Sequence, residues 1–371
     1  MTSILIVIGT RPEAIKLAPV IRALRPVAAV TVVRTGQQSA LADAMLGELG
    51  IVADIALQQV PNPYTLAELT AVTLRDIDAV LAHLQPDWVV VQGDTNSAAA
   101  AALAAFYRGI RVGHVEAGLR THDLADPFPE EGNRRLIGSI AALHFAPTPR
   151  AARNLADEGV PVERVRMTGN PIVDAVDELR RGWSEADRAE IAQRLGFVGR
   201  PVVLVTSHRR ENQGPALHAI CAAIRTLAMR HPQVLWLFPM HPNPALRDIL
   251  RHDLGGLPNL VLREPLDYRE TLLVIEHCVL VVTDSGGLQE EVAAFGRPAV
   301  VLRERTERPE IVEAGLAVLT GHDTDRIVAA VMERLDAGTS NAMPAGMANP
   351  FGDGHAAERI AAALTGTDLA T

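Results

Sequence analysis

The chain is poor in cysteine and aromatic residues and has no long apolar run. Its 371 residues include 2 cysteines, Cys221 and Cys278, too few and too isolated for a disulfide framework or a thiolate metal cage. We expect both to be buried core residues in a reducing compartment. The longest apolar stretch, residues 98–106, is about half a membrane span, and residues 4–8 lack the length and basic flank of a signal peptide. The sequence therefore favours a soluble, cytoplasmic protein without a membrane partner.

Charge and motif spacing exclude further classes. The formal net charge is -9, and a surface that is negative on average repels phosphate backbones, so we expect no nucleic-acid partner. His208 and His241 lie on different predicted strands without paired ligand spacing, so no metal site is predicted. The glycine turn after residues 4–8 lacks the three-glycine dinucleotide fingerprint, which argues against NAD or FAD. We predict no cofactor, and chemistry carried by carboxylates, a histidine and cations.

The chain does contain a series of short apolar runs, each followed by a polar residue or glycine and then by a helical pattern. This alternation is typical of buried parallel strands in βαβ units. Because 371 residues exceed what one core usually serves, we predict an α/β fold of two Rossmann-like domains with parallel sheets, residues 1–170 and 171–354, followed by a C-terminal helix and tail at 355–371. The predicted strands are residues 4–8, 29–33, 88–91, 112–115 and 143–146 in the first domain, and 202–206, 234–238, 261–262, 279–283 and 299–302 in the second.

Three acidic residues follow predicted strands or stiff loops of the first domain. Ligand groups gather beyond the carboxyl ends of strands in doubly wound sheets. Asp94 and Glu116 follow strands that we expect to be neighbours, and adjacent carboxylates push one another's pKa values apart, which suits acid–base work. Glu130 follows two prolines that stiffen its loop. The alternative for each acid is a helix N-cap or an ordinary salt bridge.

Cations follow the first strand of each predicted domain. Arg11 lies on a glycine turn, and Lys16 lies one helical turn beyond Pro12, so that both would reach the crevice beside the sheet. The alternative is a solvated helix start with proline at the first position. In the second domain, His208, Arg209 and Arg210 follow the strand at residues 202–206 and add a histidine and two cations to the crevice edge.

An anion site is predicted after the strand at residues 279–283. The turn formed by Ser285, Gly286 and Gly287 would present backbone N–H groups at a helix start, a ready site for a diphosphate. Glu291, one turn into that helix, would accept hydrogen bonds from ribose hydroxyls, and Arg308 adds a cation that need not have a local counter-charge. A simple helix cap at Ser285 is the alternative.

Together these motifs resemble those of the bacterial non-hydrolysing UDP-N-acetylglucosamine 2-epimerases. The resemblance runs from residue 4 to about residue 364, and its motifs are long and keep the same order. The matching motifs are Gly9-Thr10-Arg11-Pro12-Glu13-Ala14-Ile15-Lys16, Gly93-Asp94-Thr95, His114-Val115-Glu116-Ala117-Gly118-Leu119-Arg120-Thr121, Pro129-Glu130-Glu131, His208-Arg209-Arg210-Glu211, Asp284-Ser285-Gly286-Gly287, Thr306-Glu307-Arg308-Pro309-Glu310 and Asn349-Pro350-Phe351-Gly352-Asp353-Gly354.

The resemblance implies a fold similar to the GT-B glycosyltransferases, with the active site in the interdomain cleft and a C-terminal helix that crosses back to the first domain. It also implies a homodimer that converts UDP-GlcNAc reversibly to UDP-ManNAc for cell-envelope polysaccharide synthesis. In this family UDP is eliminated across C1–C2 to give 2-acetamidoglucal, and then adds back. Such a route needs carboxylates that move the C2 proton, and cations and helix N–H groups where leaving-group charge develops.

The resemblance assigns roles to three sets of residues. The catalytic candidates are Asp94, Glu116, Glu130 and His208; the substrate-binding candidates are Arg11, Lys16, Ser285, Gly286, Gly287, Glu291 and Arg308; and Gln37, Arg210 and His241 resemble contacts to UDP-GlcNAc bound as an activator. Which acid serves which face of C2 is left open.

Two positions depart from the family pattern. Thr271 stands where the family usually has an aromatic residue near the uracil, so uridine stacking is expected to be weaker or to come from another side chain. Gln38 and Ser39 replace a histidine and an arginine in the loop of the second sugar-nucleotide site. We therefore expect regulation by UDP-GlcNAc to be weakened.

Three other functions stay open. A GT-B glycosyltransferase would need an acceptor, a hydrolysing epimerase would add water to the glycal and release free ManNAc, and a catalytically silent nucleotide-sugar sensor would not need the three acids.

Overall fold

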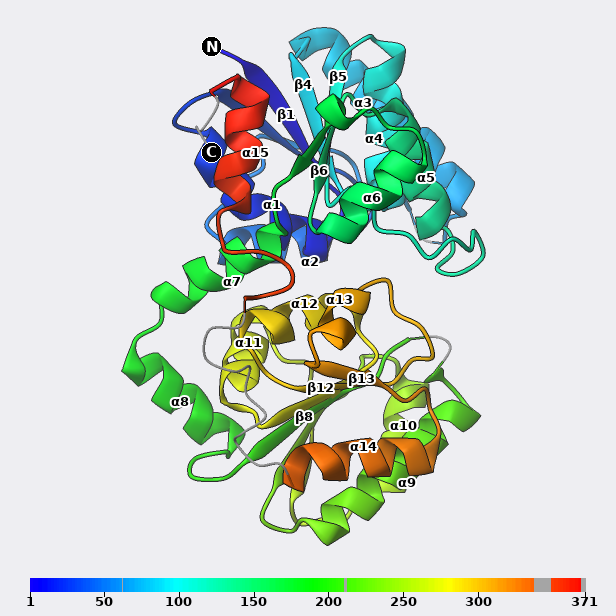
Figure 1. Cartoon of the computed structure of the whole chain (residues 1–371), viewed down its shortest axis with the longest axis vertical. Helices are drawn as coiled ribbons and strands as arrows, with labels where there is room; N and C mark the ends of the chain where they lie inside the picture. The colour runs from blue at the N-terminus through cyan, green and yellow to red at the C-terminus, as the bar shows by residue number, and fades with distance from the viewer. Residues whose placement is uncertain (62, 210–211, 337–347, 368–371) are drawn as a thin grey trace. The chain divides into compact units, whose positions relative to one another are not determined.

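The computed structural model describes residues 1–61, 63–209, 212–336 and 348–367, and the chain divides into two compact units. The first comprises Met1–Glu178 and Phe351–Thr371, and the second comprises Leu179–Pro350. Each unit is a parallel sheet with helices on both faces (Figure 1). The prediction of two parallel-sheet α/β domains is confirmed, and the fold is GT-B-like.

The sheet of the first unit has seven parallel strands in the order β3-β2-β1-β4-β5-β6-β7. Its central strands are almost entirely apolar because helices cover both faces. The strands are β1 (Ser3–Ile8), β2 (Ala29–Arg34), β3 (Ile55–Ala56), β4 (Trp88–Gln92), β5 (Arg111–Val115), β6 (Leu143–Ala146) and β7 (Val165–Met167). The helices are α1 (Arg11–Leu24), α2 (Ser39–Glu48), α3 (Leu66–Leu84), α4 (Asn96–Tyr107), α5 (Glu130–Ile140), α6 (Pro149–Asp157), the 3-10 turn η1 (Val162–Arg164) and α15 (Ala356–Thr365), while α7 (Pro171–Arg181) contains the boundary between the units.

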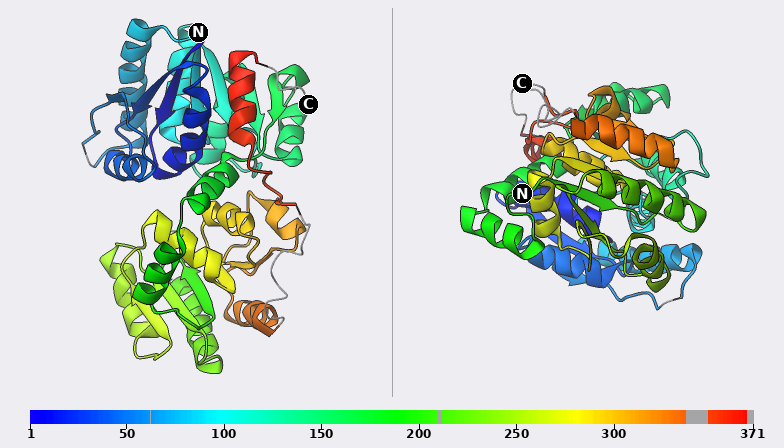
Figure 2. Two further views of the ribbon diagram at one scale, coloured as in Figure 1. Left: turned by 90° about the vertical axis from the view of Figure 1, so that its left-hand side faces the viewer. Right: turned by 90° about the horizontal axis from the view of Figure 1, so that it is seen from below.

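Small residues let the helices of the first unit approach its sheet closely. The alanines of α4 are buried between α3, α5 and the sheet. On the other side α1 packs against α15, which lies beside it in Figure 1 and in the left-hand view of Figure 2. Gly113 of β5 makes room for this last helix, since a Cβ there would lie 3.3 Å from a methyl carbon of Leu364.

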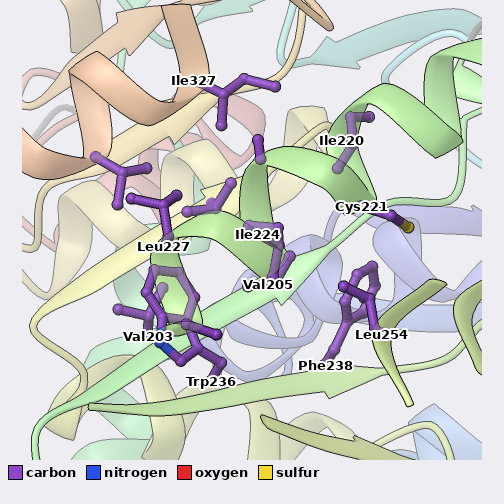
Figure 3. Close-up of a cluster of buried hydrophobic side chains, with 14 of the residues drawn as sticks. Val203, Val205, Ile220, Cys221, Ile224, Leu227, Trp236, Phe238, Leu254 and Ile327 are labelled. Carbon is purple, nitrogen blue, oxygen red and sulfur yellow. The ribbon is translucent and has the colours of Figure 1, made fainter. Parts of the chain in front are cut away.

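The sheet of the second unit has six parallel strands in the order β10-β9-β8-β11-β12-β13. Its strands are β8 (Val202–Thr206), β9 (Leu235–Pro239), β10 (Leu260–Arg263), β11 (Leu280–Thr283), β12 (Ala299–Val301) and β13 (Ala317–Leu319). Its helices are α8 (Glu185–Leu195), α9 (Pro215–Arg230), α10 (Pro244–Leu254), α11 (Tyr268–His277), α12 (Gly286–Ala294), α13 (Pro309–Glu313) and α14 (Thr324–Asp336). A core cluster of this unit joins Trp236 and Phe238 of β9 to Ile224 and Leu227 of α9 and to Ile327 of α14 (Figure 3).

The C-terminal segment is tied to the first unit by hydrogen bonds. The amide of Asn170 donates to the carbonyl of Phe351 at 2.7 Å. The carboxylate of Asp174 accepts from the first two amides of α15, those of Ala356 (3.2 Å) and Ala357 (2.9 Å), and its burial raises its pKa. These contacts explain why the compact units divide at 178–179 and 350–351, whereas the sequence predicts boundaries at 170–171 and 354–355. Within the described ranges, no helix is long and apolar enough to cross a membrane.

Candidate active site

Glu116 is a buried and tightly held carboxylate of the first unit. It directly follows β5, and its φ of 62° lies in the left-handed region, which a non-glycine residue keeps only when its surroundings compensate. The side chain is buried, with Oε1 2.5 Å from Nζ of Lys16 and 3.3 Å from Nδ2 of Asn170. Gln92 donates to Oε2. The carboxylate is therefore held at both oxygens.

Asp94 follows the neighbouring strand. β4 and β5 pair in register up to Gln92 and Val115, which confirms that Asp94 and Glu116 follow adjacent strands. Oδ2 of Asp94 accepts from Nε of Arg134 at 2.7 Å, and the Asp94 carbonyl accepts from a side-chain amide of α5. A Cβ on Gly93 would lie 3.6 Å from Oε2 of Glu116, so the turn that carries Asp94 lies against that carboxylate. The salt-bridge alternative is thus realised for both acids, each with its own cation.

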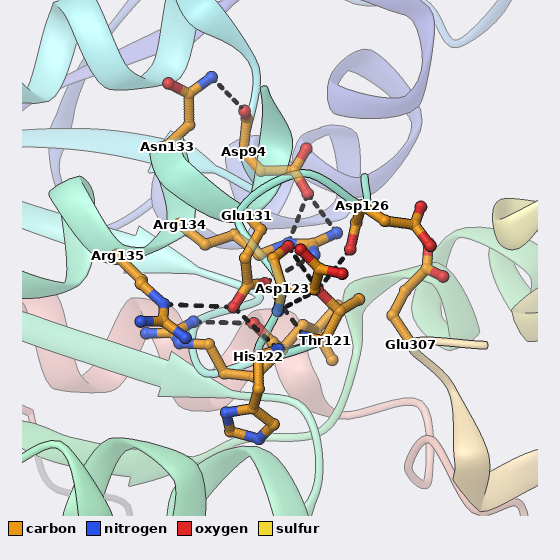
Figure 4. A network of polar contacts seen from close by, with 12 residues as sticks. Asp94, Thr121, His122, Asp123, Asp126, Glu131, Asn133, Arg134, Arg135 and Glu307 are labelled. Atoms are coloured by element: carbon orange, nitrogen blue, oxygen red, sulfur yellow. Dashed lines mark hydrogen bonds and ion pairs between the residues drawn. The ribbon is translucent and has the colours of Figure 1, made fainter. Parts of the chain in front are cut away.

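Arg134 links Asp94 to a second acid, Glu131, as Figure 4 shows. Glu131 is fully buried and accepts from the Thr121 amide at 3.1 Å, so it holds the preceding loop in place. Glu130, the first residue of α5, is half-buried. Of the two consecutive acids, Glu131 thus has a structural role and Glu130 is the one presented at the helix start.

Arg11 is the first residue of α1, directly after the turn that follows β1, and Lys16 lies further along the same helix. Lys16 is only 5% exposed, which rules out the solvated helix start for this residue. Thr10 and Glu13 form a capping box at the start of α1. Burial raises the pKa of Glu13 to about 7, in spite of hydrogen bonds from Thr95, Gly9 and Thr10 that lower it.

In the second unit, a buried aspartate organises the loop after β8. Asp284 directly follows β11, the strand that pairs with β8, and its side chain is fully buried. Its carboxylate accepts from the amides of His208 (2.9 Å) and Arg209 (3.0 Å) and from the side chains of Ser207 (3.1 Å) and Asn212 (3.0 Å). Nδ1 of His208 lies 3.4 Å from Oδ1 of the same acid. The imidazole, which is about half exposed, is therefore oriented from behind by Asp284.

The start of α12 follows at the same edge of this sheet. Ser285 is its N-cap and accepts from the Leu288 amide at 3.4 Å, so the helix-cap alternative holds for its side chain. Gly286 and Gly287 belong to the first turn, whose N–H groups have no partner within a helix. A Cβ on Gly286 would lie 2.9 Å from Nη1 of Arg308, whereas a Cβ on Gly287 would meet nothing within 4 Å.

Arg308 has counter-charges close by. Its Nε donates to Oε1 of Glu290 at 2.6 Å, and its Nη1 lies 2.9 Å from Oε1 of Glu307. The expectation that Arg308 need not be charge-matched locally is wrong. Burial alone would raise the pKa of Glu307, but Arg308, Arg303 and Arg209 outweigh it and hold that pKa far below its usual range. Glu291 is buried on α12 beside Glu290.

The predicted activator residues lie in different surroundings. Oε1 of Gln37 accepts from the Ser97 amide at 3.1 Å and so holds the start of α4. His241 is exposed after β9; partial burial, His208 and Arg247 together lower its pKa, which places it near His208. Arg210 lies outside the described residues.

Two further expectations concern the contact with the uracil ring and the metal ions. The hydroxyl of Thr271 donates to the carbonyl of Asp267 at 2.8 Å, so this position offers no aromatic face. Across residues 1–61, 63–209, 212–336 and 348–367, no group of three His, Cys, Asp or Glu is arranged to hold a metal ion.

Sequence reasoning missed four residues that hold the candidate groups: Asn170, Arg134, Asp284 and Glu13. A Thr-x-x-Glu pattern before a helix signals the capping box of Glu13. Asp284 follows a buried strand, which is the same signal that identified Asp94. The contacts of Arg134 with Asp94 and of Asn170 with Glu116 carry no local signal, because they join distant segments.

The fold and these two polar clusters define a GT-B-like α/β protein. One sheet edge carries carboxylates held by cations, and the other carries an oriented histidine and a glycine-rich helix start.

The chain is similar to known proteins along most of its length, and this similarity shows its family. The chain matches the model of the UDP-N-acetylglucosamine 2-epimerase family over residues 22–365 and belongs to this family of isomerases. It is 42% identical to the UDP-N-acetylglucosamine 2-epimerase of Salmonella typhimurium, over 97% of this chain and 98% of the relative. UDP-GlcNAc 2-epimerase from Neisseria meningitidis, solved bound to UDP-GlcNAc, is similar with a TM-score of 0.92 at 37% identity, over 97% of this chain and 99% of that one. The Methanocaldococcus jannaschii enzyme, solved with UDP-GlcNAc and UDP, has a TM-score of 0.83 at 34% identity, over 98% of this chain and 99% of that one.

Proposed function

We propose that this chain catalyses the reversible C2 epimerisation of UDP-GlcNAc to UDP-ManNAc by eliminating UDP and adding it back. The observation that carries the proposal is the pair of carboxylates after β4 and β5. Glu116 is held in a strained backbone conformation by Lys16, and Asp94 is held beside it by Arg134. Family membership supports the substrate, since two similar proteins were solved with UDP-GlcNAc.

The elimination requires a base and a stabilised leaving group. The base takes the proton from C2, the C1–O bond breaks with its electron pair going to the diphosphate oxygen, and a C1–C2 double bond forms. Re-addition restores the C1–O bond and delivers a proton to the opposite face of C2. Asp94, Glu116 and Glu130 are our candidates for moving these protons. Because the first two are already held in place, they need little reorganisation during proton transfer.

The groups of the second unit suit the leaving diphosphate. The amides of Gly286 and Gly287 at a helix start, with Ser285, favour negative charge. His208 and Arg308 add donors at the same sheet edge, with Glu291 as the ribose acceptor. In the first unit we assign Arg11 and Lys16 to the diphosphate. The reaction requires groups of both units to reach one substrate.

Assembly, regulation and compartment complete the proposal. We propose a homodimer and a reaction located in the cytoplasm. UDP-GlcNAc would contact Gln37, Arg210 and His241 as an activator, with a weakened effect because Gln38 and Ser39 carry no charge. The buried free thiols of Cys221 and Cys278 are compatible with a reducing compartment.

One experiment tests the activity against its rivals. The protein is incubated with UDP-GlcNAc in D2O without an acceptor, and C2 and free sugar are followed by proton NMR, with the Glu116→Gln variant as control. Deuterium at C2 in a mixture of UDP-GlcNAc and UDP-ManNAc is the expected result. Free ManNAc would identify a hydrolysing epimerase. An unchanged spectrum would rule out both epimerases and leave a glycosyltransferase or a sensor.

A further inference from the structure

Two helices of the first unit begin with the same capping box but in different surroundings. At the start of α3, Oε2 of Glu68 accepts from the amide (2.7 Å) and hydroxyl (2.9 Å) of Thr65, and the pair is exposed. At the start of α1, Oε2 of Glu13 accepts from the amide (2.6 Å) and hydroxyl (3.1 Å) of Thr10, but Glu13 is only 2% exposed. Because Glu68 caps α3 from an exposed position, helix capping alone does not require a buried carboxylate.

The additional contacts of Glu13 reach the neighbouring turn. Its Oε2 also accepts from the Gly9 amide at 2.6 Å, and its other oxygen, Oε1, accepts from the hydroxyl of Thr95 at 2.6 Å. Thr95 is the N-cap of α4 and directly follows Asp94. One carboxylate thus joins the turn after β1, which directly precedes Arg11, to the turn after β4, which carries Asp94.

Neutral donors make all of the described hydrogen bonds to Glu13. This distinguishes it from Glu116 and Asp94, which are paired with Lys16 and Arg134. Burying a carboxylate without a cation is costly unless its hydrogen bonds are complete. Such an arrangement is expected to bind its donors tightly and to fix both turns.

We propose that Glu13 is a positioning residue for epimerisation, which clamps the Asp94 turn to the Arg11 turn through the hydroxyl of Thr95. The expected change in kcat rests on the proposed function. The clamp itself is a contact between the two turns and does not depend on that function. Glu13 does not exchange a proton with the substrate. It holds Asp94 where that carboxylate acts, so that its loss lowers kcat more than it raises KM.

The test compares matched variants. Glu13→Gln keeps the side-chain length but brings an NH2 group against the donors, and Glu68→Gln makes the same change in the exposed capping box. Losing a hydrogen bond to a charged group corresponds to about a ten- to hundredfold effect. We expect kcat of Glu13→Gln to fall within about that range while KM changes less than about threefold, and kcat of Glu68→Gln to stay within about twofold. Equal kcat values in the two variants would overturn the proposal.

A second pair covers the case in which Glu13→Gln does not fold. Thr95→Val removes the clamping hydroxyl and one N-cap, and Thr65→Val removes an N-cap of the same type. Thr95→Val should lower kcat about tenfold or more and Thr65→Val should not, whereas Thr95→Ser, which keeps the hydroxyl, should restore kcat. Equal effects of the two valine substitutions would show that only helix capping matters.

Amide hydrogen exchange tests the clamp independently of the catalytic activity. In Glu13→Gln or Thr95→Val, the amides of residues 93–97 should exchange at least about tenfold faster than in the parent protein, and in Thr65→Val they should not. Unchanged exchange in the clamp variants would overturn the clamp even if the parent protein epimerises. Faster exchange combined with an inactive parent protein would support the clamp and refute the proposed function instead.

Discussion

Glu116 and Asp94 of the first unit and Asp284 of the second unit are held in opposite ways. Glu116 and Asp94 are each bound by a cation, Lys16 and Arg134. Asp284 is bound by backbone amides and neutral side chains of the loop after β8. The two cations place positive charge beside Glu116 and Asp94, whereas Asp284 uses its oxygens to shape a loop. We therefore expect the first unit to supply the groups that move protons, and the second unit to supply the groups that bind and orient the substrate.

The largest effect should come from neutralising the first cluster. Glu116→Gln and Asp94→Asn keep the shape of the side chains but remove the proton acceptor, so kcat should fall by at least about a hundredfold while UDP still binds. Turnover by NMR and UDP titration calorimetry measure the two quantities. Glu178→Gln is the control, since Glu178 is also paired with an arginine, Arg22, but lies outside the cluster. Near-normal turnover in both amide variants would reject the assignment.

A smaller effect is expected in the second unit. Asp284→Asn brings an NH2 group against the donors of the loop and releases His208, so kcat/KM should fall about tenfold or more. If Asp284 acts by orienting His208, the double variant with His208→Ala should be little worse than His208→Ala alone. His208→Ala itself should harm a substrate with a poor leaving group more than one with a good leaving group. Additive losses in the double variant would mean that Asp284 acts independently of the imidazole.

The pH dependence of stability is a further test of the first unit, because the described residues place no cation against the buried carboxylate of Glu13. Its pKa is raised from 4.5 to about 7 by burial. The folded protein therefore binds this proton over a pH range in which the unfolded chain has lost it, so its contribution is complete below about pH 4.5 and is lost as the pH rises through about 7. The difference corresponds to roughly 3 kcal/mol of unfolding free energy.

Urea unfolding of the parent protein and of Glu13→Gln at about pH 5 and about pH 8 measures this contribution. The parent should lose more unfolding free energy than the variant over that interval. Glu68→Gln is again the control and should follow the parent. Parallel profiles for the parent and Glu13→Gln would show that Glu13 titrates in its ordinary range.

The smallest effect concerns activation. Gln38 and Ser39 lack the charge of the histidine and arginine that the family usually has there, and losing a charged contact removes about 1.5 to 3 kcal/mol, comparable with a whole allosteric coupling. The reverse reaction from pure UDP-ManNAc should therefore start without a pronounced lag and respond little to trace UDP-GlcNAc. The double substitution Gln38→His and Ser39→Arg should introduce a lag. A long lag in the parent chain that trace UDP-GlcNAc abolishes would contradict this prediction.

The strands that sequence analysis missed share one position in the fold. β3, β7 and β13 each lie at the edge of a sheet and have two or three residues. An edge strand has a neighbouring strand on one side only, so less of it is buried and it needs no continuous apolar run. The edge strand β7, Val165–Met167, is largely exposed. The ten predicted strands are all present. Nine of them lie inside a sheet, where burial gives them an apolar pattern that can be read locally, and the tenth, β10, is an edge strand that keeps a short apolar run.

The residues of the candidate site also divide into those with a local sequence signal and those without one. Contiguous motifs identified Asp94, Glu116 and the start of α12, because a polar residue or glycine after a buried strand is visible in the sequence. The domain boundary was less visible, since Asp174 caps a helix that begins at Ala356. That contact joins segments that no local pattern relates.

Local patterns in the sequence are enough to predict two parallel α/β units, the residues that end their buried strands, and the family that the motifs resemble. They do not show that Lys16 binds Glu116 across 100 residues, that Arg134 binds Asp94, or that the donors of one loop converge on Asp284. Periodicity and capping report what each segment buries and where it ends. Which side chains meet depends on strand order and register, and these are set by the packing of the whole chain.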